Sequence, residues 1–347
     1  MAKMRAVVLH SAGDLRVEEH LLPAPDSEAV RVRIQAGGIC GSDLHYFLHG
    51  GFGTVRVREP MILGHEVAGE VISAPEGSDL APGTKVAVSP SRPCGTCEFC
   101  TEGQKNHCEN MRFYGSARPM PHIQGAFCDV IDATPEQCFA IAPHLPIEIA
   151  AFAEPLAVVL HGLRRVGDIH GRRVVITGCG PIGALTVLAA RAGGAAEVVV
   201  TDVTDGALQL ATTLGADRAI NVAKSPRWVQ DYVANKGHFH VMIEASGNEA
   251  ALRDGLSTLR PRGVLVQVGL GSDVALPIGE IVAKEIEIRG SFRFHEEFGD
   301  AVEALNTGRI DVAPLLGARF PVAETDAAFK RAAEQTNTMK IQLDFTT

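Results

Sequence analysis

A glycine-rich turn between a buried strand and a helix constrains the fold of this chain more than any other feature. The run RRVVITG, residues 172–178, is apolar enough for a strand that is buried on both faces. It continues into GCGPIG, whose glycines are Gly178, Gly180 and Gly183. The helical pattern PIGALTVLAARAGG follows and ends at two glycines. This order of strand, G-x-G-x-x-G turn and helix predicts a dinucleotide-binding βαβ unit.

The residues of this turn each have a physical role in binding a pyrophosphate. Gly178 allows the tight turn, Gly180 lets the phosphates approach the backbone, and Gly183 lets helix and strand pack closely. The helix that begins at Pro181 and Ile182 offers free N–H groups and the positive end of its dipole. A similar turn that binds another nucleotide or adenosylmethionine is the alternative.

An acidic residue ends the next strand, VVVTD, about 20 residues after the turn. This residue, Asp202, is placed to accept hydrogen bonds from the ribose hydroxyls of a dinucleotide. Its carboxylate would repel a 2′-phosphate, and the segment VTDGALQ that follows contains no Arg or Lys to offset the repulsion. We therefore expect NAD rather than NADP.

The pattern of strands and helices predicts two domains. Alternation of the two from Arg172 onward, through FHVMIEASG, GVLVQVGL and EIEIRGSF, predicts a doubly wound parallel sheet within residues 149–297. Residues 1–148 show short strands punctuated by Gly and Pro, so we expect an irregular, mostly β domain there. Residues 298–347 show helical character and then KIQLDF, a predicted strand that returns to this first domain.

Two local patterns refine this outline. The segment VRVRI, residues 30–34, alternates apolar with charged residues and predicts a half-exposed antiparallel strand. The segment AAFAEPLAVVLHGLRRVG predicts a helix that begins after the pair Glu154-Pro155.

Four cysteines fall within the short segment RPCGTCEFCTEGQKNHCEN, in the spacing C-x2-C-x2-C-x7-C. Such short spacings let thiolates fold around one tetrahedral zinc ion, and a site closed by four thiolates supports structure rather than chemistry. An iron–sulfur cluster is a second alternative and a chance group of free thiols a third. The predicted ligands of this structural zinc are Cys94, Cys97, Cys100 and Cys108.

The composition excludes several classes of protein. The 347 residues are enough for two domains, and the net charge of −9 disfavours a basic surface for nucleic acid. No apolar run is long enough for a membrane span. The first residues, MAKMRAVVLH, lack an apolar segment followed by small residues, so we expect no secretion signal and a cytoplasmic location. In that reducing compartment the eight cysteines are not expected to form disulfides.

Cys40, the pair His65-Glu66, and Glu154 are further residues of zinc-ligand type. A catalytic zinc needs about three protein ligands and one open position. Taken singly, Cys40 can be a core thiol, His65 a hydrogen-bonded turn residue, and Glu154 an acid at a helix N-terminus. Their spacing in the sequence does not by itself unite them in one site.

The segments that contain them resemble the zinc-dependent medium-chain alcohol and polyol dehydrogenases over essentially the whole chain. The matching motifs are GGICGSDLHY, GHEVAGEV, the four-cysteine segment, FAEPLAV, GCGPIG and VVVTD. The resemblance implies a GroES-like catalytic domain, formed by residues 1–148 and 298–347, together with a Rossmann domain. It also implies one catalytic and one structural zinc and oligomers of two or four chains.

The same resemblance assigns residues to the catalytic site. It implies that Cys40 and His65 bind the catalytic zinc, with Glu66 and Glu154 as equally ranked third ligands that can exchange. Zinc would acidify a secondary hydroxyl, and Ser42 and then His45 would carry its proton away.

The resemblance further implies contacts with cofactor and substrate. The implied reaction is oxidation of a sugar acid by NAD, L-idonate to 5-ketogluconate, with sorbitol, xylitol or L-threonine as alternative substrates. Since an aldonate is an anion, an arginine is expected to bind its carboxylate. The expected substrate residues are Tyr46, Arg112 and Arg293. The expected cofactor contacts beyond the turn are Val268, Leu270, Phe292 and Arg293.

Overall fold

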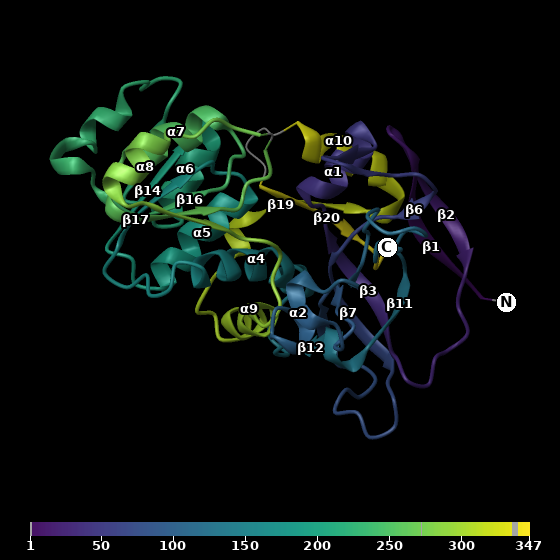
Figure 1. Cartoon of the computed structure of the whole chain (residues 1–347). Coiled ribbons are helices and arrows are strands. Elements are labelled where there is room, and N and C mark those ends of the chain that lie inside the picture. The colour runs from purple at the N-terminus through teal and green to yellow at the C-terminus, as the bar shows by residue number, and fades with distance from the viewer. Residues whose placement is uncertain (1, 272, 335–338) are drawn as a thin grey trace. The chain divides into compact units, whose positions relative to one another are not determined.

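The structure, a computed structural model, describes residues 2–271, 273–334 and 339–347. The chain forms two compact units (Figure 1). The first comprises Met1–Glu154, Phe298–Gly308 and Leu316–Thr347, and the second comprises Pro155–Glu297 and Arg309–Leu315. Among the described residues, no helix is both long and apolar enough to cross a bilayer.

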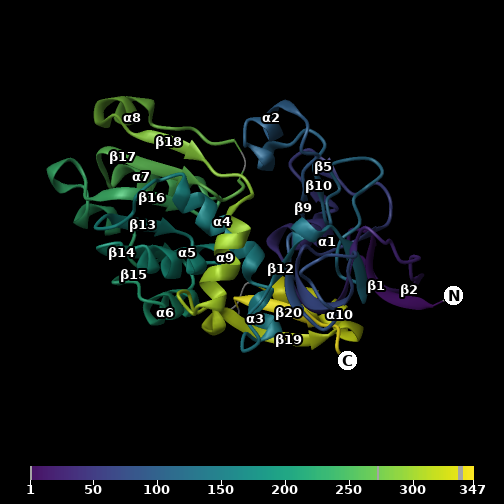
Figure 2. The same cartoon turned by 90° about the horizontal axis from the view of Figure 1, so that it is seen from below.

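The second unit is built on a six-stranded parallel sheet in the order β15-β14-β13-β16-β17-β18 (Figure 2). Its strands are β13 (Arg173–Thr177), β14 (Glu197–Asp202), β15 (Arg218–Asn221), β16 (Phe239–Glu244), β17 (Leu259–Gln267) and β18 (Glu287–Gly290). Its helices are α4 (Ala153–Arg164), α5 (Pro181–Ala192), α6 (Asp205–Thr213), α7 (Glu249–Ser257) and α8 (Ile278–Lys284). The chain runs outward on both sides of β13 and β16, so the loops after these two strands diverge and leave room for a ligand. This sheet confirms the predicted Rossmann fold.

Burial explains why the central strands are apolar along their whole length. Val174, Val175 and Ile176 of β13 are fully buried, because α5 contacts β13 and β14 while α7 contacts β13, β16 and β17. Helix α5 ends at Ala192, just before the two glycines that were expected to stop it.

The first unit contains a seven-stranded sheet in the order β12-β8-β7-β3-β20-β19, with β11 also paired to β3. Its strands are β3 (Val30–Gly38), β7 (Glu66–Ser73), β8 (Lys85–Val88), β11 (Val130–Ala133), β12 (Cys138–Ala140), β19 (Leu316–Pro321) and β20 (Lys340–Asp344). A second sheet has the order β2-β1-β6, from β1 (Lys3–Ser11), β2 (Asp14–Leu21) and β6 (Met61–Ile62). This largely antiparallel unit confirms the predicted GroES-like, mostly β domain.

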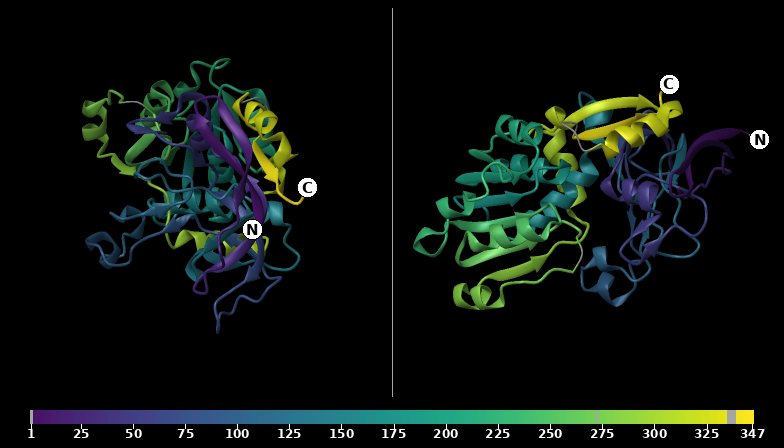
Figure 3. Two further views of the ribbon diagram at one scale, coloured as in Figure 1. Left: turned by 90° about the vertical axis from the view of Figure 1, so that its right-hand side faces the viewer. Right: turned by 90° about the horizontal axis from the view of Figure 1, so that it is seen from above.

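Short elements complete this unit. The two-residue strands are β4 (Gly51–Phe52), β5 (Val55–Arg56), β9 (Ser91–Arg92) and β10 (Arg112–Phe113). The helices are α1 (Gly41–His49), α2 (Glu98–Thr101), α3 (Ile147–Ala150), α9 (Glu297–Asn306) and α10 (Thr325–Ala333). The predicted strand KIQLDF is β20; it pairs with β3, and α10 packs on β19 and β20 (Figure 3).

Three local expectations need correction. Residues 41–49 form helix α1 inside the region expected to be irregular and all-β, because Cys40 and Asp43 form a capping box at its start. Strand β3 is largely buried rather than half-exposed, because Arg31 is held by the carboxylate of Asp132 at 2.7 Å. Helix α4 begins at Ala153, before the Glu154-Pro155 pair rather than after it. Proline is tolerated in the first helical turn, because the N–H that it lacks would have no partner within the helix.

Candidate metal centres and nucleotide site

Cys40, His65 and Glu66 come together where α1 and β7 begin. Their ligand atoms, one sulfur, one imidazole nitrogen and one carboxylate oxygen, all lie within 4.8 Å of one another. Cys40 is the N-cap of α1, directly after β3, and Glu66 opens β7 opposite Gly38 of β3. The antiparallel pairing of β3 with β7 therefore brings together residues that lie 25 positions apart in the sequence.

Two glycines let the backbone approach the side chains of this group. Gly64, just before His65, has φ = +92°, and a Cβ there would lie 2.1 Å from the ring of Phe127. A Cβ at Gly38 would lie 2.2 Å from Oε2 of Glu66. Larger residues at these two positions would displace the core or the carboxylate, so both glycines fix the geometry of the site.

Asp43 connects the backbones on both sides of the group, and the sequence analysis did not identify it. Its fully buried carboxylate accepts hydrogen bonds from the N–H of Cys40 at 3.0 Å and of Gly64 at 3.3 Å. Its Oδ1 also lies 3.6 Å from Nδ1 of His65. An acidic residue three positions after a helix N-cap is a capping-box signal, so the sequence did contain a cue to it.

Lys340 is a second residue of this site that the sequence analysis missed. It comes from β20, is 3% exposed, and its Nζ lies 2.8 Å from both carboxylate oxygens of Glu66. Burial alone lowers the pKa of Lys340, but the negative charges of Glu66 and Cys40 outweigh burial and raise it. Lys340 therefore stays an ammonium ion and offsets the charge of Glu66.

The chemistry of this donor set fits a zinc ion. Burial raises the pKa of the Cys40 thiol to about 12, and the charge of Glu66 adds to the effect, so the thiolate needs a nearby cation. Among the described residues, the buried Nδ1 of His65 has no hydrogen-bond partner. Sulfur, imidazole nitrogen and carboxylate oxygen are the ligand types that zinc prefers, and metal binding would stabilise all three together.

Glu154 lies beside this group but outside its closest set of donors. It stands in the first turn of α4 and is buried. Burial raises the pKa of Glu154 to about 8, with Glu66 and Cys40 adding to the effect and His65 opposing it. Of the two carboxylates ranked equally from the sequence, Glu66 is the one within 4.8 Å of the Cys40 and His65 donors.

The three predicted residues on α1 differ in their surroundings. Ser42 is half-buried, and its hydroxyl hydrogen-bonds the Cys40 thiol and lowers the pKa that burial raises. His45 is exposed, with its ring 5.9 Å from that of Phe52. Tyr46 is buried and its hydroxyl accepts the N–H of Ala117 at 3.2 Å, so its polar end is engaged in the core.

The four clustered cysteines also lie within 4.8 Å of one another through their sulfur atoms. The sulfurs of Cys94 and Cys100 are 4.0 Å apart, and those of Cys97 and Cys108 are 3.9 Å apart. Tetrahedral coordination with Zn–S bonds of about 2.3 Å places sulfurs about 3.8 Å apart. Backbone N–H groups point at two of them: the N–H of Cys94 at Cys108 and that of Cys97 at Cys94. The lobe is therefore shaped for a tetrahedral four-thiolate site.

The glycine turn of the second unit has the geometry expected of a nucleotide site. Gly178 has φ = +88°, and a Cβ there would lie 2.8 Å from Ser246. A Cβ at Gly183 would lie 2.0 Å from the carbonyl oxygen of Gly178, so the strand and helix could not pack. At Gly180 a Cβ would meet no atom of the described residues within 4 Å, so the backbone can be approached there by a ligand, and α5 begins at Pro181 directly after it.

Asp202 is tied to the same turn. Its carboxylate accepts backbone N–H groups of Cys179 at 2.6 Å, Val203 at 2.7 Å and Thr204 at 2.8 Å. These bonds hold the acidic group at the carboxyl end of β14, next to the start of α5. A cation from outside VTDGALQ comes near this region: Lys224 forms an ion pair with Asp205.

Comparison with known proteins identifies the family. Residues 26–143 match the alcohol dehydrogenase GroES-like domain, and residues 181–307 match the zinc-binding dehydrogenase domain. L-idonate 5-dehydrogenase (NAD(P)(+)) from Escherichia coli is 42% identical over 315 residues, which cover 90% of this chain and 91% of the relative. The chain belongs to the zinc-binding dehydrogenase family. It is therefore an oxidoreductase that acts on CH–OH donors.

Other relatives and solved structures agree with this assignment. Sorbitol dehydrogenase from Gallus gallus is 38% identical over 330 residues, 94% of this zinc-binding dehydrogenase and 92% of the relative. The crystal structure of the Escherichia coli L-idonate 5-dehydrogenase superposes with a TM-score of 0.95 at 40% identity, covering 99% of both chains. A zinc-binding dehydrogenase from Sinorhizobium meliloti bound to NADP superposes at 0.90 with 30% identity, covering 99% of this chain and 100% of that one.

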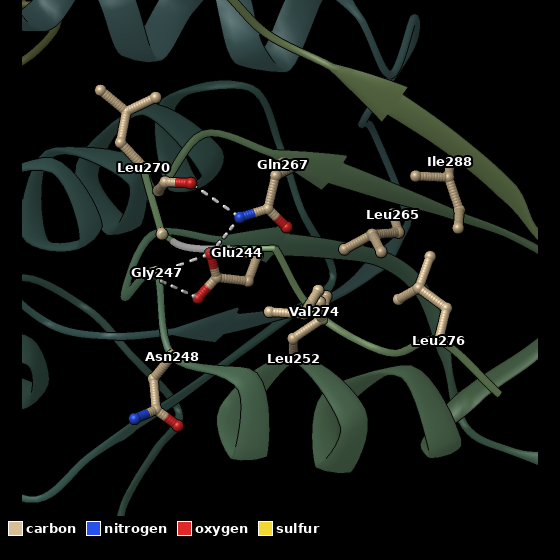
Figure 4. Close-up of a pocket in the computed structure, with 12 residues that line it drawn as sticks. Glu244, Gly247, Asn248, Leu252, Leu265, Gln267, Leu270, Val274, Leu276 and Ile288 are labelled. Atoms are coloured by element: carbon tan, nitrogen blue, oxygen red, sulfur yellow. Dashed lines mark hydrogen bonds between the residues drawn. The ribbon is translucent and has the colours of Figure 1, made fainter. Parts of the chain in front are cut away.

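A buried carboxylate organises the loop that faces the glycine turn of this zinc-binding dehydrogenase. Glu244, at the end of β16, accepts the N–H of Gly247 at 3.0 Å and an N–H of Nε2 of Gln267 at 2.6 Å (Figure 4). It also accepts the N–H of Ser246 at 2.8 Å. It borders a cavity of about 320 Å³ whose other walls are mainly apolar. Because Ser246 packs on Gly178, Glu244 supports the turn, and the sequence analysis missed it.

The remaining predicted residues lie on loops and strand ends. Val268 follows β17, and its N–H donates to the Glu244 carbonyl at 2.9 Å. Leu270 and Phe292 are exposed, and the Arg293 guanidinium lies 5.0 Å from the centre of the Phe292 ring. Arg112 opens β10 and is also exposed.

Proposed function

We propose that this dehydrogenase oxidises a secondary alcohol of a sugar acid, L-idonate to 5-ketogluconate, with NAD as the hydride acceptor. The observation that supports L-idonate as the substrate is the 42% identity over 315 residues to L-idonate 5-dehydrogenase. The group of Cys40, His65 and Glu66 supports the chemistry, because three mixed ligands leave zinc one open position. A neutral polyol is the second candidate, supported by the 38% identity to sorbitol dehydrogenase.

The proposed ligands of the catalytic zinc are Cys40, His65 and Glu66, with Glu154 beside them as the carboxylate that can replace Glu66. When bound there, zinc supplies a Lewis acid that lowers the pKa of an alcohol. Asp43 holds the backbone of the ligands, and Lys340 limits the negative charge of the group. The proposed ligands of the structural zinc are Cys94, Cys97, Cys100 and Cys108.

Ser42 and His45 are the proposed route for the substrate proton. Ser42 follows Cys40 in the first turn of α1, and His45 lies one turn further along the helix toward solvent. A hydroxyl both donates and accepts, and imidazole groups exchange protons readily near neutral pH. The two side chains would thus pass the proton outward, and NAD, when bound, would supply the hydride acceptor.

The proposed cofactor is NAD, bound with its pyrophosphate at Gly178–Gly183 and its ribose at Asp202. We expect Asp202→Asn to lower kcat/KM for NAD and to raise it for NADP, because the substitution removes the charge that repels a 2′-phosphate. The ratio of the two values should fall by at least about tenfold, which corresponds to about 1.4 kcal/mol. Steady-state kinetics with both cofactors measure it.

Asp231→Asn is the matched control for this test, because Asp231 is an exposed aspartate of the same unit that pairs with Arg218. The control should leave the ratio unchanged. A ratio that stays constant in Asp202→Asn would show that Asp202 does not select the cofactor.

The proposed substrate residues are Arg293 and Arg112, with Tyr46 as a packing residue. We expect wild-type kcat/KM to be highest for L-idonate in a panel with sorbitol and L-threonine, followed by NADH absorbance. Arg293→Ala should lower kcat/KM for idonate by about 10–100-fold, the loss expected for a charge-assisted hydrogen bond worth roughly 1.5–3 kcal/mol. Activity on sorbitol should change by less than about threefold.

The substitution adds no backbone strain of its own, because Arg293 has φ = +55° and alanine meets the same conformational cost there as arginine. An equal loss of kcat/KM on idonate and on sorbitol would show that Arg293 does not bind the substrate carboxylate. A panel in which sorbitol is the best substrate would instead favour the polyol candidate.

We also propose a cytoplasmic homo-oligomer assembled through the edge strand β18. Ile278, Val282 and Ile288 are large apolar residues exposed on α8 and β18. Antiparallel pairing of β18 with its copy about Ile288 would place Glu287 opposite Arg289, so charges complement each other across the pair. Light scattering should give a multiple of the 36.8 kDa chain mass, and the mass of a single chain would contradict this assembly.

A further inference from the structure

A group of basic residues lies at the amino-terminal edge of the six-stranded sheet. Arg173 opens β13, His240 is the second residue of β16, and Arg260 is the second residue of β17. These three parallel strands are neighbours in the sheet, so their amino ends lie side by side (Figure 2). The glycine turn and Asp202 follow the carboxyl ends of β13 and β14, at the opposite edge.

Two hydrogen-bond donors converge at the imidazole of His240. Its Nδ1 lies 3.1 Å from the backbone nitrogen of Arg173, and its Nε2 lies 3.0 Å from Nη1 of Arg260. A neutral imidazole has one accepting nitrogen and one N–H. Because Nδ1 accepts the backbone N–H, Nε2 carries the proton and stands beside a guanidinium that can only donate. An oxyanion placed beside both groups would accept from both.

The charges around this point are mostly positive. Within the described part of the chain, Arg172, Arg173 and Arg260 form no ion pair with a carboxylate. Nε of Arg173 donates to the carbonyl of His238 at 2.8 Å. One acidic residue, Glu197, lies opposite Arg173 in the pairing of β14 with β13, and its carboxylate is engaged with Nε2 of His238 at 2.6 Å.

The state of His240 agrees with this arrangement. Burial lowers the pKa of His240, and the positive charges of Arg173, Arg260 and Arg172 lower it further, with His238 adding to the effect. The ring is therefore neutral at physiological pH, with its single N–H available to a ligand.

We propose that Arg173, His240 and Arg260, with the charge of Arg172, bind a small phosphate-bearing anion at this edge of the sheet. Guanidinium groups bind phosphate oxygens through paired, charge-assisted hydrogen bonds, and the N–H of His240 supplies one more. Since Arg260 is exposed, we expect millimolar rather than tight affinity. The site is separate from the pyrophosphate site at Gly178–Gly183.

Calorimetric titration of the NADH-saturated enzyme with inorganic phosphate tests the proposal, because NADH then fills the nucleotide site. Sodium chloride at matched ionic strength serves as the blank. We expect saturable binding that Arg260→Gln weakens by at least about tenfold. The control is Arg253→Gln, an exposed arginine of α7 that pairs with Glu249, and it should bind phosphate as the wild type does. Absence of saturable binding, or equal binding by Arg260→Gln, would overturn the site.

The imidazole signals in nuclear magnetic resonance spectra give a second readout that a purely structural role of Arg260 would not move. His240→Gln identifies the signal of His240. Phosphate should raise the pKa of His240, because a bound anion favours the imidazolium form. A His240 titration curve that is the same in phosphate and in chloride would contradict the proposal, even if phosphate binds elsewhere.

Discussion

Cys40→Ser will lower kcat by at least about 100-fold and reduce the zinc content from two ions per chain to one. Loss of an outer hydrogen-bond partner of a metal ligand typically costs about 10–100-fold in activity or metal affinity, and loss of a ligand itself should cost more. The serine hydroxyl is a much poorer zinc ligand than a thiolate, and it leaves His65, Glu66 and Lys340 in place. Mass spectrometry for zinc and steady-state kinetics measure the two effects on the same preparation.

Cys138→Ala is the control for this variant, because Cys138 is a buried thiol of β12 outside both cysteine-containing metal groups. It should retain two zinc ions and an activity within about threefold of the wild type. A Cys40→Ser enzyme with full activity would mean that hydride transfer does not depend on a metal at this site.

The second large effect is expected at Cys100→Ser, and it concerns stability more than catalysis. Burial raises the pKa of the Cys100 thiol to about 12. Without a cation, this thiol therefore stays neutral beside the sulfurs of the other three cysteines. Structural zinc binding contributes roughly 10–16 kcal/mol in isolated zinc-finger peptides, and losing even a fraction should lower Tm by more than about 10 °C. Differential scanning calorimetry and zinc content test this expectation.

The two cysteine variants should differ in the property that each loses. Below its lowered Tm, Cys100→Ser should keep most of the wild-type kcat with one zinc ion, whereas Cys40→Ser should keep a nearly normal Tm with very little kcat. If Cys100→Ser retains two zinc ions and an unchanged Tm, the four sulfurs do not form a structural metal site. Cys138→Ala again shows how much a buried thiol contributes without a metal.

Features encoded by neighbouring residues were predictable from the sequence. The glycine turn and Asp202 lie within about 25 residues, and the four cysteines lie within 15, so spacing alone indicated both groups. Strand β20 was also identified, because a short apolar segment near the end of the chain needs a partner strand. These features depend on local backbone geometry and on ligand spacing.

Features that depend on contacts between distant residues were not predictable. Lys340 meets Glu66 across 274 positions, and nothing in KIQLDF marks its lysine as buried. The choice between Glu66 and Glu154 likewise depends on which carboxylate lies closer in space to the Cys40 and His65 donors. Helix α1 was missed because its capping residue is a cysteine, which is not one of the usual N-cap residues.

The late position of Lys340 in the chain has a consequence for synthesis of the protein. Chains grow at about 5–20 residues per second, so roughly 15–55 seconds separate Glu66 from Lys340 on the ribosome. During that interval β3 lacks its neighbour β20, and the Glu66 carboxylate lacks its ammonium partner. The sheet around β3 therefore remains incompletely packed until β20 has been synthesised.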